Sequence, residues 1–186
     1  MQRIAQFFLR RPLSASPLTL LTWLLVGLAA VRVFYVVLHD PMFGYGNQFD
    51  MGRTAACLDL WPELPGGPRD IGYFEAPVEK HRLVKIASQA CYPGIEAAFD
   101  KLVITLDGVR RHFAGEPDRV DMRVIGLFKA MLLFAAAWRV HKALQPWPGA
   151  VLMHAAILLF VIADPLNTLY LNTLYGEFFA VLGAYM

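Results

Sequence analysis

The segment PLTLLTWLLVGLAAVRVFYVVL, residues 17–38, constrains the fold more than any other part of the sequence. It contains no acidic residue, and an apolar helix of about 20 residues is long enough to cross a bilayer. The run is too long for a cleaved signal peptide, and the HDP that follows it lacks the small residues of a cleavage site. We therefore predict that this segment is a transmembrane helix.

Two further apolar segments, 122–140 and 149–163, have a similar character. Only 17% of all residues are charged, against about 25% in soluble domains. The apolar residues 178–186 begin another run that stops after nine residues, whereas a span needs about 20. The sequence predicts an all-α polytopic membrane protein with three transmembrane helices and the start of a truncated fourth, within a longer protein.

Charge distribution predicts the orientation of these spans. Lys and Arg accumulate on the cytoplasmic side, and both the N-terminal arm and the connector near 141–148 are basic. The long segment 39–121 carries 13 acidic and 9 basic residues. We expect a multi-pass protein of the bacterial inner membrane with a cytoplasmic N-terminus and the lipid bilayer as its partner. The formal net charge of +2 gives no indication of nucleic-acid binding. The expected segments are a cytoplasmic arm (1–16), a first span (17–38), an extracytoplasmic loop (39–121), a second span (122–140), a cytoplasmic connector (141–148), a third span (149–163), an extracytoplasmic polar and aromatic segment (164–177) and the start of a fourth span (178–186).

The extracytoplasmic loop is expected to be mostly helical, with helices over 78–90 and 95–113. Both cysteines of the chain, Cys57 and Cys91, lie in this loop. In an oxidising compartment they can form a disulfide, which would close a loop of about 35 residues and contribute about 3–4 kcal/mol. The alternative is two unrelated buried thiols. Two thiols without further ligands nearby do not form a metal site.

Three polar clusters are expected on the extracytoplasmic side: His39 with Asp40, the segment 47–53, and the segment 164–177. Carboxylates at membrane depth cost about 2.5–3.5 kcal/mol and are kept mainly where they face a polar cavity or a partner. Asp164 has a simpler reading, because an acid before Pro165 caps a new helix. Glu177 precedes two phenylalanines and is the stronger candidate for a functional or packing role.

Other polar residues also have structural and functional readings. Asp50 either forms a surface ion pair with Arg53, worth little, or belongs to a site. His154 is expected to form a hydrogen bond between helices. Arg32 and Lys129 lie inside spans at similar expected depths. They either extend to the interface or bind an anion such as a lipid-linked phosphate.

The order of these features resembles the N-terminal part of the GT-C membrane glycosyltransferases, which use polyprenyl-phosphate sugars. The resemblance rests on the layout: a basic arm is followed by one span, a large first loop with an early Asp, and later spans with polar and aromatic outer ends. The segments NQFDMGRTAACLDLWP (47–62) and NTLYLNTLYGEFFA (167–180) also look like parts of uncharacterised bacterial multi-span proteins of this kind. The family's enzymes usually have many more spans than this chain.

The resemblance implies roles for particular residues. A first-loop carboxylate, Asp50 or alternatively Asp40, would act as the base toward an acceptor hydroxyl or would bind a divalent metal. Basic residues at the membrane boundary would hold the lipid phosphate, and Arg123 is a further candidate for this role. Tyr175 and Glu177 would line the sugar cavity. The candidate substrate-binding residues are Arg32, Arg53, Lys129, Asn172, Tyr175 and Glu177.

The implied reaction is transfer of a sugar from a polyprenyl-phosphate donor to a glycan or lipid acceptor on the extracytoplasmic face. Two other functions fit the same layout. One is part of a transporter or flippase in which Arg32, Lys129 and Glu177 line a path, although the sequence shows no repeat of the spans. The other is a non-enzymatic envelope protein whose loop binds partners.

Overall fold

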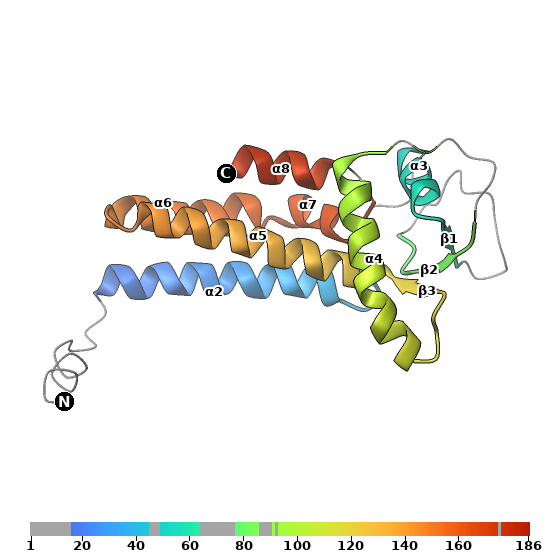
Figure 1. Cartoon of the computed structure of the whole chain (residues 1–186). Coiled ribbons are helices and arrows are strands. Elements are labelled where there is room, and N and C mark those ends of the chain that lie inside the picture. Colours follow the sequence, from blue (N-terminus) through green and yellow to red (C-terminus); the bar gives the residue numbers. More distant parts are fainter. Residues whose placement is uncertain (1–15, 45–48, 64–76, 86–90, 92, 175) are drawn as a thin grey trace, which may run out of the picture.

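The computed structural model describes residues 16–44, 49–63, 77–85, 91, 93–174 and 176–186. The helices are α2 (Pro17–Leu38), α3 (Phe49–Cys57), α4 (Ile95–Phe113), α5 (Met122–Leu144), α6 (Pro148–Ile157), α7 (Pro165–Thr168) and α8 (Glu177–Tyr185), with a π-helical turn η1 (Leu158–Ile162) and a 3-10 turn η2 (Leu169–Asn172). Helices α2, α5, α6 and α8 run side by side in a bundle (Figure 1). The described residues between α2 and α5 form a cap on one end of this bundle, and α4 crosses that end at a steep angle (Figure 1).

The first bundle helix begins and ends where local chemistry requires it. The Ser16 hydroxyl accepts a hydrogen bond from the Thr19 amide, and Pro17 occupies the first turn of α2, where a missing N–H is tolerated. At the other end, His39 is extended, and Pro41 follows it. The helix predicted over 17–38 is confirmed with these bounds.

Helices α2 and α5 are each long and apolar enough to cross a membrane. The continuous helix of α6 and η1 meets the criterion only together with α7 and η2, and the two parts meet at a bend of 68°. The described chain therefore has two candidate spans, or three if the bent pair counts as one. α5 continues to Leu144, beyond the predicted end of the second span at residue 140.

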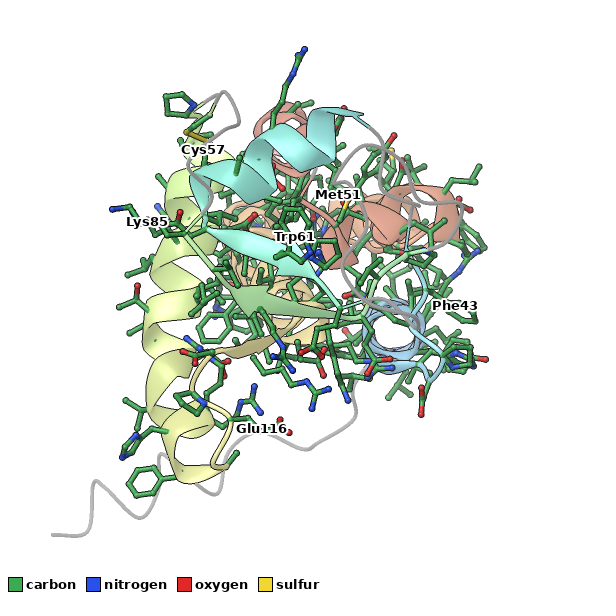
Figure 2. The ribbon with its side chains drawn as sticks, turned by 90° about the vertical axis from the view of Figure 1, so that its right-hand side faces the viewer. Phe43, Met51, Cys57, Trp61, Lys85 and Glu116 are labelled. Atoms are coloured by element: carbon green, nitrogen blue, oxygen red, sulfur yellow. A yellow bond between two sulfur atoms is a disulfide. The ribbon has the colours of Figure 1, made fainter. Side chains whose placement is uncertain are left out.

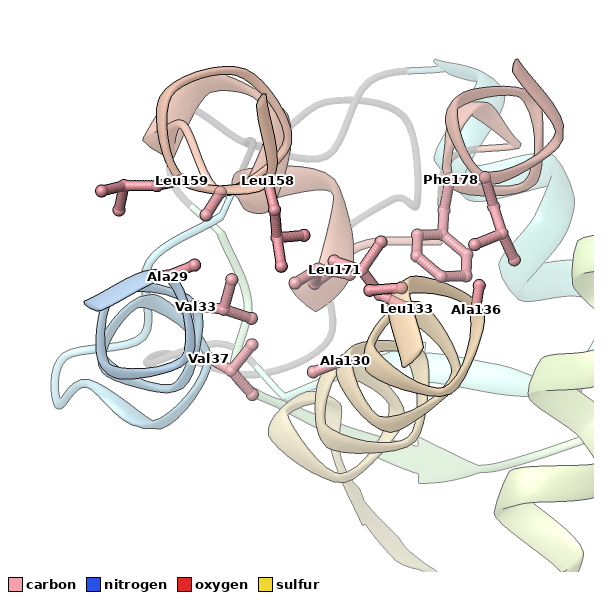
Figure 3. Packing of buried hydrophobic residues seen from close by; sticks show 13 residues of the cluster. Ala29, Val33, Val37, Ala130, Leu133, Ala136, Leu158, Leu159, Leu171 and Phe178 are labelled. Carbon is pink, nitrogen blue, oxygen red and sulfur yellow. The ribbon is translucent and has the colours of Figure 1, made fainter. Parts of the chain in front are cut away.

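Small side chains allow close packing in the bundle core. Figure 3 shows Ala29 and Val33 of α2 facing Leu158 and Leu159 of η1, with Ala130 of α5 nearby. Small residues at helix contacts let backbones approach closely, and the resulting van der Waals packing is one of the forces that drive helix association inside membranes. Many large apolar side chains on the opposite side of α2 are exposed, as a lipid-facing surface requires.

In the described part of the cap, three short strands form an antiparallel sheet: β1 (Leu60–Pro62), β2 (Lys80–Leu83) and β3 (Arg119–Asp121), in the order β1-β2-β3. The helix predicted over 78–90 is therefore wrong at Lys80–Leu83, and residues 86–90 lie outside the described part. His81 is buried between the more exposed Lys80 and Arg82, as strand geometry dictates. The cap is consequently a mixed structure rather than the mostly helical loop that was expected.

The helix predicted over 95–113 is confirmed as α4. Its C-terminus is followed by Gly115 with a φ of 74°, a backbone conformation that glycine adopts without strain. The chain then turns into β3, and Asp121 caps α5 by accepting a hydrogen bond from the Arg123 amide. This short connection from α4 through β3 to α5 holds the cap against the bundle.

Candidate functional site

The most deeply buried charges of the described chain lie where the cap meets the bundle. Lys129 of α5 is fully buried, and its ammonium donates a short hydrogen bond to Glu96 of α4 and a 2.8 Å hydrogen bond to the Thr173 carbonyl oxygen. The Lys129 ammonium also lies 3.5 Å from the Asp100 carboxylate and 5.7 Å from the centre of the Phe178 ring. We call Lys129, Glu96 and Asp100 the junction cluster.

Two carboxyl groups share one ammonium in the junction cluster, so a fully ionised cluster would carry a net negative charge. Burial raises the pKa of Asp100 to about 7, against the opposing effect of Lys129 and with a further contribution from Glu96. Burial also raises the pKa of Glu96. Neither oxygen of Asp100 has a hydrogen-bond partner among the described residues. Near neutral pH, the cluster can therefore gain or lose a proton at Asp100.

Asn172 lies at the same junction and closes the end of α2. Its amide group donates hydrogen bonds to the carbonyl oxygens of Val36, Val37 and Phe43, at 2.9–3.3 Å. Gly126 of α5 makes room for this side chain, since a Cβ at that position would collide with the Asn172 Oδ1 atom. Asn172, predicted as a substrate-binding residue, is fully buried, and its donors are used by backbone carbonyls.

Two of the predicted arginines, Arg32 and Arg123, each meet a carboxylate. The Arg32 guanidinium lies 3.4 Å from Asp164, and both side chains are about one third exposed. The Arg123 guanidinium binds Asp40 at 3.1 Å and Glu79 at 2.8 Å. Asp40, the alternative catalytic candidate, is a largely exposed partner in this pair. Asp164 also accepts a hydrogen bond from the Leu166 amide, which confirms that it caps α7.

Asp50 lies in the first turn of α3, and its side chain is outside the described part of the structure. Three residues later in the chain, Arg53 is half-buried. Between them, Met51 is buried in one apolar cluster with Leu174, which lies beyond η2. α3 and the segment that leads to α8 therefore contribute to the same apolar core.

The polar segment after the third predicted span is thus divided between buried and exposed positions. Thr173 and Leu174 are buried, whereas Glu177, the first residue of α8, is exposed. Tyr175 lies outside the described residues. Glu177 is close enough to Glu96 to contribute to its raised pKa, although burial is the larger cause. The predicted candidates Asn172 and Glu177 therefore flank the junction cluster.

A disulfide connects two elements of the cap. Cys57 at the end of α3 is bonded to Cys91, which lies shortly before α4. The predicted pairing of the two cysteines is confirmed. The bond ties the helix that carries Asp50 to the helix that supplies Glu96 and Asp100.

At the far end of the bundle, His154 of α6 forms a 2.5 Å hydrogen bond with the Tyr185 hydroxyl of α8, which confirms its predicted role between helices. The same two side chains line an apolar groove of about 520 Å³ between α5, α6 and α8. The groove is remote from the junction cluster along the bundle axis, since α4 lies at the other end (Figure 1).

Among the described side chains, no group of three or more His, Cys, Asp or Glu residues is arranged to hold a metal ion. The junction cluster itself already contains an ammonium, which repels cations. The described residues thus do not fit a divalent metal, and we derive no step that uses one. Comparison with known proteins gave no match to any family model, curated protein or solved structure.

Sequence reasoning missed the partners of Lys129. Glu96 and Asp100 are four residues apart and lie on one face of the predicted helix, together with Asp107 and Arg111. Charged faces of loop helices are usually solvated, so this face alone does not indicate burial. The signal that identifies it is the second, purely apolar face of the same helix.

Proposed function

We propose that this chain is a membrane glycosyltransferase component that transfers a sugar from a polyprenyl-phosphate donor on the extracytoplasmic face. The described chain contains two or three candidate membrane spans, which supports association with a lipid bilayer. The disulfide between Cys57 and Cys91 supports an extracytoplasmic cap, because disulfides persist in oxidising compartments. The proposal extends the resemblance in sequence layout to the site at the cap–bundle junction.

One observation carries the proposal: Met51 and Leu174 belong to a single buried apolar cluster. This cluster includes residues from the start of α3, where Asp50 lies, and from the segment that leads to Tyr175 and Glu177. These parts are more than 100 residues apart in the sequence, and each was a candidate for the same site on sequence grounds. A carboxylate near the bundle end and an exposed acid at the start of α8 are a suitable arrangement for a polar acceptor at the membrane boundary.

In the proposed reaction, the Asp50 carboxylate takes the proton of an acceptor hydroxyl as the acceptor oxygen attacks the anomeric carbon of the donor sugar. The bond between that carbon and the phosphate oxygen breaks. Polyprenyl phosphate leaves with the electron pair. A positioned carboxylate base of this kind contributes about 10²–10⁴-fold to the rate.

Arg32 is the better candidate than Lys129 for the lipid phosphate. The ammonium of Lys129 is fully buried and opposed by two carboxylates. The Arg32 pair with Asp164 is partly exposed, and its 3.4 Å separation is longer than the 2.7–2.9 Å typical of charge-assisted hydrogen bonds. A lipid phosphate can therefore compete with Asp164 for the Arg32 guanidinium.

The test is transfer of labelled sugar by membranes that contain the chain, with undecaprenyl-phosphate glucose and undecaprenyl-phosphate mannose as probes. We expect Asp50→Asn to lower the rate by about 100-fold or more without lowering the amount of protein in the membrane. Glu116→Gln is the matched control, because Glu116 is an exposed cap carboxylate (Figure 2) that pairs with Arg119 of β3. Transfer by Asp50→Asn within about twofold of the control variant, or no transfer from either probe by the unaltered chain, would contradict the proposal.

A further inference from the structure

Helix α4 carries a large apolar stripe that no other described element covers. Five of its side chains lie on one helical face and are 55–85% exposed: Ile95, Leu102, Leu106, Val109 and Phe113. In Figure 2, α4 forms the left edge of the molecule, and no helix or strand lies on its outer side. Contiguous exposed apolar surface of this kind marks a contact with another apolar phase or partner.

The charges of α4 are arranged in the opposite way to those of an ordinary surface helix. The structure describes α4 over its whole length, and all three of its acidic residues, Glu96, Asp100 and Asp107, are buried. Its exposed formal charges are the cations of Lys101 and Arg110, and the Arg110 guanidinium also pairs with the buried Asp107 at 2.6 Å. At 100° per residue, Lys101 and Arg110 lie on opposite flanks of the apolar stripe. The solvent-facing side of α4 is therefore apolar with a basic border.

α4 lies at one end of the candidate spans α2 and α5, where the cap meets the bundle (Figure 1). α4 crosses the end of the bundle at a steep angle to α2 and α5 (Figure 1). α4 contacts α5 at Lys129, which lies about 10 Å along α5 from Met122, the first residue of that helix. The Phe99 ring, at the edge of the stripe, contacts the Phe179 ring of α8 with 5.4 Å between centroids. The apolar stripe is thus continuous with the side of the bundle.

We infer that α4 lies in the membrane plane, with its stripe on the acyl chains and its basic border on the phosphates of anionic phospholipids. Helices of this type combine an apolar face with flanking Lys and Arg and insert about 5–10 Å into the boundary between headgroups and acyl chains. Each Lys or Arg near an anionic surface strengthens the attraction. A second copy of the chain fits the stripe less well, since two α4 helices face to face would bring their basic borders together.

The inference is tested with two neighbouring positions of the full chain in vesicles of phosphatidylcholine and phosphatidylglycerol. Leu106→Cys lies in the stripe, and Thr105→Cys is the matched control on the exposed polar side. Each new thiol is labelled with a small fluorophore while the disulfide is kept intact. Quenching is measured with lipids brominated in their acyl chains and, separately, with aqueous iodide.

We expect bromolipids to quench the label at residue 106 at least about threefold more than the label at 105, with the reverse order for iodide. Brominated phosphatidylglycerol should quench residue 106 more than brominated phosphatidylcholine at equal mole fraction, and Lys101→Gln should reduce this difference. Equal bromolipid quenching at the two positions would overturn the inference. Protection of residue 106 from both quenchers would also overturn it, because a protein surface would then cover the stripe. Equal quenching by the two brominated lipids would overturn the preference for anionic lipid.

Discussion

Replacing Lys129 by methionine removes the only cation of the junction cluster and keeps nearly the same side-chain volume. The change leaves Glu96 and Asp100 buried without an opposing charge, and it removes the hydrogen bond to the Thr173 carbonyl. Breaking a buried ion pair by removing one partner costs about 3–5 kcal/mol. With two carboxylates on one ammonium, we expect a loss at the upper end of this range at pH 8.

The loss in free energy of unfolding should depend on pH, because the carboxyl groups that have lost their ammonium partner can be protonated. Asp100 already has a pKa of about 7 in the folded chain, above its ordinary value of 3.8. A carboxyl whose pKa is raised on folding contributes most to stability at pH values below its unfolded pKa, and that contribution is lost as the pH rises through about 7. In Lys129→Met both carboxyls stay protonated to higher pH. The variant and the unaltered chain should then differ less in free energy of unfolding as the pH falls. For each carboxyl that is protonated only in the variant, this difference should shrink by about 1.4 kcal/mol per pH unit.

The assay is denaturant unfolding of the full chain in detergent micelles at pH 5.5 and pH 8, followed by tryptophan fluorescence. Lys101→Met is the matched control, since Lys101 is an exposed lysine of α4 whose loss should change stability by less than about 0.5 kcal/mol. The triple variant Lys129→Met, Glu96→Gln and Asp100→Asn should recover most of the loss, because neutral groups replace the whole cluster. A loss below about 1 kcal/mol for Lys129→Met at pH 8, or a triple variant as unstable as the single one, would refute this account of the cluster.

Two further predictions concern how the cap and the bundle are joined. Gly126→Ala should destabilise the folded chain by about 1–3 kcal/mol, because the new Cβ collides with the Asn172 side chain. The same unfolding assay checks this prediction. Gly183→Ala is the control and should have little effect, because nothing lies within 4 Å of a Cβ at that position. Loss of the bond between Cys57 and Cys91 should cost about 3–4 kcal/mol, measured as faster proteolysis of the cap in the Cys57→Ser, Cys91→Ser double variant. Unchanged proteolysis would show that the cap does not depend on the disulfide.

The candidate spans could be predicted from the sequence because their signals are local. The helix over 17–38 has a continuous apolar run, a serine cap, a proline in the first turn and an extended residue after its end. The strand β2 gives no comparable signal. Its four residues KHRL contain three basic side chains, and they pair with Leu60–Pro62 and Arg119–Asp121, at distant positions in the chain. Such pairing is a tertiary effect that a local pattern does not contain.

The junction cluster could not be predicted for a different reason. A lysine inside a span has several physically reasonable partners: lipid headgroups, a bound phosphate or a protein carboxylate. The choice depends on which face of α4 turns toward α5, and α4 has both an apolar face and a charged face. In a watery setting the apolar face would be the buried one. The structure buries the charged face of α4 and leaves the apolar face exposed, the reverse of what a local pattern favours.

The motif Asn-Thr-Leu-Tyr occurs twice after the third predicted span, at 167–170 and 172–175. The asparagines of both copies donate hydrogen bonds to carbonyl oxygens at helix ends. The Asn167 amide donates a hydrogen bond to the Val161 carbonyl oxygen at the end of η1, and the Asn172 amide donates to Val36 and Val37 at the end of α2. The last carbonyls of a helix have no partner within the helix, and in an apolar setting each unpaired group is expensive. The crowding of polar residues in this segment therefore follows from two helix ends that need donors. This accounts for both asparagines. Glu177, which is exposed beyond the second repeat, lies in the first turn of α8, where the helix dipole favours an acidic side chain.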